Sequence, residues 1–81
     1  MSNEIQKDFL KKLGKQIKKI RTERGLTQTA LAHLCGKDSQ SLQRVESGNT
    51  NPTAWYLQHI AVALNVEVKE LFDTDLPKPK V

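Results

Sequence analysis

Four polar side chains in the short segment 38–46 have the hydrogen-bonding chemistry needed to bind the edges of DNA bases. They are Ser39, Gln40, Gln43 and Arg44. Arginine can pair bidentately with guanine and glutamine with adenine, and serine can bind either a base or a phosphate. A polar helix face that only contacts solvent would have the same composition. These four residues alone therefore leave both interpretations open.

The surrounding residues predict a short helix that presents these four side chains outward or sideways. Leu42 and Val45 stand three positions apart and define one buried face. Asp38 can cap the start of the helix, because its carboxylate can accept a hydrogen bond from a free amide of the first turn. Gly48 is expected to end the helix, since glycine adopts the left-handed conformation at little cost.

A second short helix is predicted immediately before the helix at 38–46. Thr27 is a suitable cap for its start, and Leu31, Ala32 and Cys35 form a narrow apolar face. Gly36 is expected to end it. The small side chain of Ala32 would let the two helices cross closely. Two short helices joined by a tight turn that contains glycine form a helix-turn-helix.

Apolar residues at helical spacing predict three further helices, one before this pair and two after it. Their apolar positions are, in chain order, Phe9, Leu10, Leu13, Ile17 and Ile20; then Leu57, Ile60, Ala61 and Leu64; then Val66, Val68, Leu71 and Phe72. Thr53 is expected to cap the fourth helix. We therefore expect an all-α domain of five helices over residues 9–72. Residues 1–8 form a polar lead-in that can extend the first helix, and residues 73–81 form a flexible tail.

Gly14 and Cys35 are best explained by packing. Glycine inside a helix costs about 1 kcal/mol relative to alanine, so Gly14 is expected to permit the close approach of another helix. Cys35 occupies a position that needs a small apolar residue, which favours a buried space-filler over a nucleophile. As the single cysteine of the chain, it excludes an internal disulfide and a metal site built on several thiolates.

The charges of this chain of 81 residues and net charge +4 are divided unevenly along its length. Residues 11–44 carry nine lysines and arginines against two acidic residues, a balance of +7. Residues 46–75 carry five acidic residues against one lysine, a balance of −4. A basic half is expected of a surface that faces phosphates. Most of the lysines between residues 11 and 19 also fit the solvent-exposed face of an amphipathic helix.

Several functional classes are excluded by what the sequence lacks. It contains no apolar run long enough to span a membrane and no signal-peptide pattern, so we expect a cytoplasmic protein. No catalytic arrangement of serine, cysteine, histidine or paired carboxylates is apparent, and no glycine-rich phosphate loop. His33 and His59 have no acidic or thiol partners at ligand spacing, which favours surface histidines over metal ligands. We expect neither an enzyme nor a cofactor.

Three runs of the sequence resemble the phage repressor and Cro family of helix-turn-helix proteins, the XRE-like family. They are IKKIRTERGLTQTALAHLCG, LQRVESGNTNP and IAVALNVEVKELF. The resemblance extends over roughly residues 13–72, and it is the combination of these runs that is specific. It implies a compact lambda-repressor-like fold in which the helix around 38–46 enters the major groove of DNA.

The resemblance also implies roles for individual residues. The positions of Ser39, Gln40 and Arg44 read bases in the family, and Gln43 lies beside them. Gln28 is expected to contact a phosphate and to brace Gln40. Free amides in the first turn of a helix, and the polar loop that follows residue 48, favour phosphate as well. The full set of expected phosphate contacts is Thr27, Gln28, Lys37, Asn49, Thr50 and Asn51.

Six residues receive other interpretations. The family pairs an arginine with a glutamate at the positions of Arg21 and Glu46, which implies an ion pair that ties two helices together. Leu34 is apolar where the family is usually polar, and Trp55 and Tyr56 occupy positions that are often exposed. These three residues could reflect packing peculiar to this chain or could mark a partner or dimer surface. The sequence leaves both interpretations open. Lys37 replaces a commonly apolar turn residue, so the turn could be more open or Lys37 could reach a phosphate.

The sequence thus predicts a regulator of transcription that binds specific double-stranded DNA, acts as a repressor and uses no small-molecule substrate. One recognition helix spans too few base pairs to single out a site in a genome, which predicts a homodimer on a palindromic operator. The expected dimer contact is formed by Val66, Val68, Leu71 and Phe72. The alternative is an antitoxin that binds a toxin protein and represses its own operon, although the short tail offers little room for a toxin-binding element.

Overall fold

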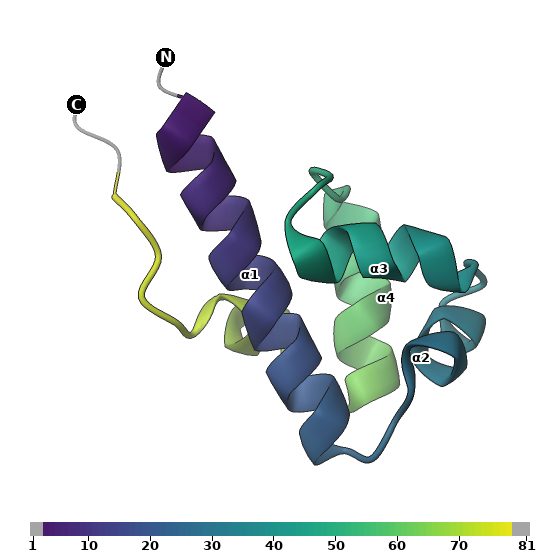
Figure 1. The fold of residues 1–81 in the computed structure, drawn as a ribbon. Helices are drawn as coiled ribbons and strands as arrows, with labels where there is room; N and C mark the ends of the chain where they lie inside the picture. Colours follow the sequence, from purple (N-terminus) through teal and green to yellow (C-terminus); the bar gives the residue numbers. More distant parts are fainter. Residues whose placement is uncertain (1–2, 79–81) are drawn as a thin grey trace.

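Four α-helices and one short 3-10 helix make up the computed structural model of the chain, which describes residues 3–78 (Figure 1). The elements are α1 Asn3–Glu23, α2 Gln28–Leu34, α3 Ser39–Ser47, α4 Ala54–Leu64 and η1 Val68–Phe72. No residue of this described part belongs to a strand, which confirms the all-α class. The prediction of five α-helices is wrong, because the last element has only five residues and is wound as a 3-10 helix.

The ends of the predicted elements agree with the local capping signals. The side chains of Thr27, Asp38 and Thr53 each accept a hydrogen bond from the amide three residues later, over 3.0, 2.7 and 3.0 Å respectively. Gly48 and Asn65 end α3 and α4 in the left-handed conformation, with φ of 77° and 58°. These caps set the length of α2 and α3 and therefore which side chains α3 exposes.

The predicted lead-in continues α1, which begins at Asn3. Residues 73–78 of the predicted tail contain no helix, and Leu76 and Pro77 are partly buried there. Residues 1–2 and 79–81, at the two ends of the lead-in and tail, lie outside the described part of the chain. The first and last elements are in contact through two aromatic rings: the centroid of the Phe9 ring in α1 lies 6.3 Å from the centroid of the Phe72 ring in η1.

The hydrophobic core receives side chains from all five elements. Its fully buried large members are Ile17, Leu31, Leu42, Ile60, Leu64 and Leu71. The element η1 contacts both α1 and α4, so that Leu71 is enclosed by the chain itself. The assignment of Leu71 to a dimer contact is therefore wrong. Val66 and Phe72 are partly buried against the same core, and Val68 is 38% exposed.

Gly14 allows α1 to pass close to α3. A Cβ atom at this position would collide with the backbone carbonyl oxygens of Val45 and Glu46 and lie 2.7 Å from the carbonyl carbon of Glu46. A second close approach occurs at Gly48, where a Cβ atom would lie 2.8 Å from backbone atoms of Lys11. These two contacts hold the C-terminal half of α3 against α1, and α2 also packs on α3.

Candidate nucleic-acid interface

The helix α3 has one face fixed by packing and another that is free. Leu42 and Val45 are buried in the core, whereas Gln40, Gln43 and Arg44 are exposed. Ser39, at the start of the helix, is partly buried. The three exposed residues extend donors and acceptors that are not bonded to other side chains within residues 3–78. These side chains are therefore free to form hydrogen bonds with another molecule.

A buried ion pair lies beneath this exposed face. The Arg21 guanidinium binds the Glu46 carboxylate through two hydrogen bonds, from Nε to Oε2 over 2.6 Å and from Nη2 to Oε1 over 3.0 Å. Only 7% of Arg21 and 6% of Glu46 is exposed. Arg21 Nη1 also donates to the carbonyl oxygen of Leu26 over 2.7 Å. This cation thus connects the end of α1, the turn that follows it and the end of α3.

Gln28, which is partly buried, is the third member of this cluster, and the sequence does not indicate its contact with Glu46. Its Nε2 donates to Glu46 Oε1 over 2.8 Å, so Gln28 braces Glu46 and not Gln40 as expected. Glu46 therefore accepts three hydrogen bonds from two side chains. A glutamine in the first turn of α2 and a glutamate late in α3 gave no local signal for this pairing, because they are 18 residues apart.

The expected phosphate contacts fall into separate groups. Gln28 lines one hollow together with Gln43 and Lys18. The loop residues 49–51 line a second hollow with the first turns of α1. Thr27 is exposed, but its hydroxyl already caps α2. The Lys37 ammonium lies 5.3 Å from the centre of the Tyr56 ring, so in this structure it makes a cation–π contact inside the chain.

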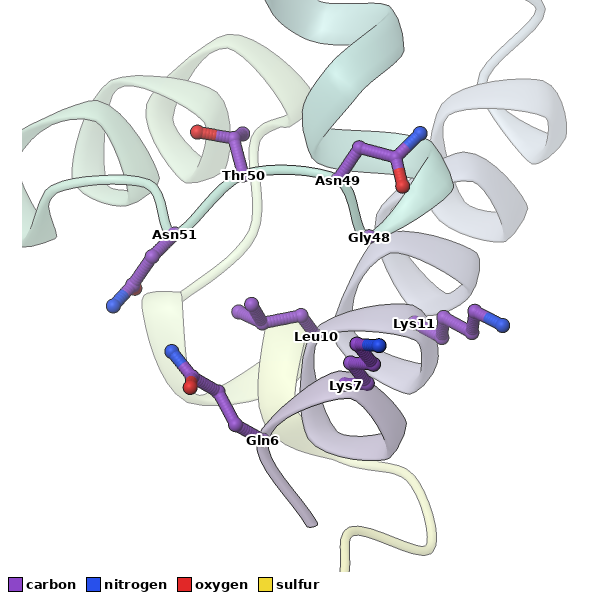
Figure 2. Close-up of a pocket in the computed structure, with 8 residues that line it drawn as sticks. All are labelled: Gln6, Lys7, Leu10, Lys11, Gly48, Asn49, Thr50 and Asn51. Atoms are coloured by element: carbon purple, nitrogen blue, oxygen red, sulfur yellow. The ribbon is translucent and has the colours of Figure 1, made fainter. Parts of the chain in front are cut away.

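Figure 2 shows the second hollow, where the loop passes over the start of α1. Asn49 and Asn51 are exposed on the loop, and Thr50 is partly buried. The helix contributes the side chains of Gln6, Lys7, Leu10 and Lys11 to the lining, and the hollow measures about 490 Å³. Lys7 and Lys11 are both exposed. The sequence does not indicate Lys7 or Gln6 as candidates, because it predicts a polar lead-in for residues 1–8.

A different face of the molecule exposes large apolar side chains. Leu34 at the end of α2 is 60% exposed, and Trp55 and Val62 on α4 are 68% and 66% exposed. The Trp55 and His59 rings lie 4.5 Å apart between centroids. Tyr56 is buried, contrary to the expectation for its position, because it lies one turn before Ile60 on the inner face of α4. Leu34 and Trp55 thus remain candidates for a partner surface, and Tyr56 does not.

The remaining reactive groups fit structural roles. Burial raises the pKa of the Cys35 thiol above its ordinary value, which keeps it protonated and unreactive near neutral pH. Within residues 3–78 no three histidine, cysteine or acidic side chains lie close enough together to hold a metal ion. None of the helices formed by residues 3–78 combines the length and the apolar character that a membrane span requires.

The sequence and the fold match known regulators. Residues 17–71 match the profile of the helix-turn-helix family HTH_3. The uncharacterised HTH-type transcriptional regulator y4dJ of Sinorhizobium fredii is 38% identical over 64 residues, which cover 79% of this chain and 83% of that protein. The ImmF control region 10 kDa protein of Bacillus phage phi105 is 35% identical over 66 residues, covering 82% and 73% of the two chains.

A solved structure shows the same arrangement of helices. The restriction-modification controller protein C.AhdI from Aeromonas hydrophila superimposes with a TM-score of 0.77 at 38% sequence identity. The match covers 78% of this chain and 96% of the controller. Family profile, relatives and fold therefore agree with the resemblance found in the sequence. The chain belongs to the helix-turn-helix family HTH_3 and is a DNA-binding transcriptional regulator.

Proposed function

We propose that the chain represses transcription by placing α3 in the major groove of a specific DNA operator. The observation that carries this proposal is the exposed face of α3, where Gln40, Gln43 and Arg44 have no competing side-chain partner in the described part of the chain. A helix fits the width of the major groove, where each base pair presents a distinct pattern of donors and acceptors. Arg44 would read a guanine, and Gln40 or Gln43 an adenine.

Contacts on both sides of α3 would hold it in register. The start of α2, with Thr27 and Gln28, would bind one stretch of phosphates, and the loop residues Asn49, Thr50 and Asn51 another. Such contacts position the protein but carry little sequence information. The balance of +7 over residues 11–44 supplies the attraction to a polyanion. Lys37 would join the phosphate contacts by leaving the Tyr56 ring.

The active form is a homodimer in which each subunit supplies one recognition helix. A single helix spans only a few base pairs, and a genome offers too many competing sites for that to suffice. The contact would be centred on Val68, which is exposed, with the partly buried Val66 and Phe72 beside it. Residues 46–75 carry a balance of −4, so this contact comes from the acidic part of the sequence. We place the protein in the cytoplasm, without a cofactor.

The antitoxin alternative has less support. The relatives reported above are a transcriptional regulator, a phage control-region protein and a controller of a restriction-modification system. All three descriptions concern control, and none names a toxin. The regulator is therefore the function we retain.

Selection of duplexes from a random pool, followed by footprinting, tests this proposal. We expect an imperfect palindrome whose half-site centres are about 10 base pairs apart, or a multiple of that spacing. Light scattering should show two chains on each selected duplex. A pool that yields no enriched sequence would contradict specific recognition. Full-affinity binding of one chain to an isolated half-site would contradict the dimer.

A further inference from the structure

Three neighbouring hollows follow one another along the junction of α1 with α3 and the loop that follows it, and we call this row of hollows the groove. The first hollow, lined by α1 and residues 48–51, shares Lys11 with the second. The second, of about 460 Å³, shares Lys18, Glu46 and Ser47 with the third. The third, of about 220 Å³, contains Gln28 and Gln43. The groove therefore joins two places where phosphate contacts are expected from the sequence, the start of α2 and the loop.

Five lysines of α1 line this groove, and one of them, Lys12, is paired with Asp8. We call the other four the lysine track: Lys7, Lys11, Lys15 and Lys18. They are four, four and three residues apart, so they lie on one side of the helix. At a rise of about 1.5 Å per residue, the track is about 16 Å long. All four are exposed, and none is within 4.0 Å of a carboxylate in the described part of the chain.

The acidic residues of the groove have partners of their own. Asp8 binds the ammonium of Lys12 over 3.1 Å, one turn further along α1. Glu46 is occupied by Arg21 and Gln28. The charges that remain to attract a ligand are therefore those of the lysine track. A row of separate positive charges suits a polyanion with regularly spaced phosphates better than a small anion, which could use only one or two of them.

We propose that the backbone of one DNA strand lies along the lysine track and that Lys7 and Lys11 contact its phosphates beside the loop. This inference rests on the proposed function and extends it to residues before the segment that matches the family profile, which begins at residue 17. The hollow in Figure 2, which is lined by Lys7 and Lys11 of α1 and by the loop residues 48–51, is where the last phosphate binds.

The salt dependence of DNA binding tests the lysine track. Each phosphate that a protein neutralises contributes about 0.9 to the slope of log affinity against log salt. The double variant Lys7→Ala/Lys11→Ala should therefore lose about 1.8 of this slope. When salt rises from about 50 to about 200 mM, the fold-loss of affinity should then be about ten times larger for the unmodified protein than for the variant. Thermal melting of the variant should be unchanged, because both side chains are exposed.

The matched control is Lys19→Ala/Arg24→Ala, which removes two positive charges from exposed positions outside the groove that have no ion pair in the described part of the chain. If the two double variants change the slope equally, the lysines act only by long-range attraction and the proposal is overturned. A slope unchanged by Lys7→Ala/Lys11→Ala overturns it as well. The preference for selected over random DNA separates this proposal from the proposed function. A protein without that preference, but with a slope that depends on Lys7 and Lys11, would contradict the function and support the track.

Discussion

The two sides of α3 differ in what holds their residues in place. On the buried side, Leu42 and Val45 pack in the core, and Glu46 accepts three hydrogen bonds. On the exposed side, Gln40 and Arg44 use none of their side-chain donors within the described part of the chain. Glu46 and Arg44 are only two residues apart. The position of a residue around the helix axis therefore separates structural roles from roles in DNA binding.

The same contrast holds for residues of one type. Gln28 and Gln40 are both expected to lie near DNA, but the Gln28 amide is partly buried and bonded to Glu46. Gln40 is exposed and has no such partner. A change on the buried side should therefore alter the free energy of unfolding, and a change on the exposed side should alter DNA binding. The following predictions test that separation.

The largest effect is expected for Glu46→Ala. This change leaves the buried Arg21 guanidinium without its carboxylate and should lower the free energy of unfolding by about 3–5 kcal/mol. Chemical denaturation measures the loss. Asp8→Ala is the matched control, because Asp8 pairs with Lys12 over 3.1 Å on the surface of α1 and its removal should cost about 0.5 kcal/mol or less. Equal denaturation midpoints for the two variants would show that the buried pair contributes no more than a surface one.

A smaller effect is expected when the two glutamines are compared. Gln28→Ala removes a hydrogen bond to a charged acceptor and should cost about 1.5–3 kcal/mol of stability. Gln40→Ala should change stability by no more than about 0.5 kcal/mol. Both variants would be measured by urea denaturation under the same conditions. If Gln40→Ala is the more destabilising of the two, the separation between the faces of α3 fails.

Gly14→Ala tests the contact between α1 and the buried side of α3. In an exposed helix this change gains about 1 kcal/mol. Here the added Cβ atom meets the carbonyl oxygens of Val45 and Glu46, so we expect a loss of about 1–3 kcal/mol. Lys15→Ala, at the next position and exposed, should be nearly neutral. A stabilised Gly14→Ala variant would mean that the two helices do not approach as closely as described.

The parts of the fold that could be predicted from sequence depend on local signals. Thr27, Asp38 and Thr53 cap their helices through bonds to amides three residues away, so each signal lies within four positions. The burial of Leu71 could not be predicted in this way. It depends on η1 resting against α4 and also against α1, which is distant in sequence. In the sequence alone, the apolar segment of η1 resembles an exposed contact surface, because the sequence does not show that α1 and α4 cover it.

The candidate site was predictable to a similar extent. The spacing of Leu42 and Val45 was enough to place Gln40 and Arg44 on the exposed face of α3. The partner of Gln28 could not be predicted, because Glu46 comes within its reach only when the start of α2 packs near the end of α3. The exposure of Val62 had a weak signal in its position two residues after Ile60, on the outer side of α4.

The central claim is that the exposed side of α3 reads DNA sequence, and Arg44→Ala tests it most directly. Affinity would be measured for a selected operator and for random DNA, with Lys18→Ala as the control for a phosphate contact. We predict that Arg44→Ala weakens operator binding by about 1–3 kcal/mol and relaxes the sequence preference at one base pair. Lys18→Ala should weaken both complexes similarly. Equal losses on operator and random DNA for Arg44→Ala would contradict the claim.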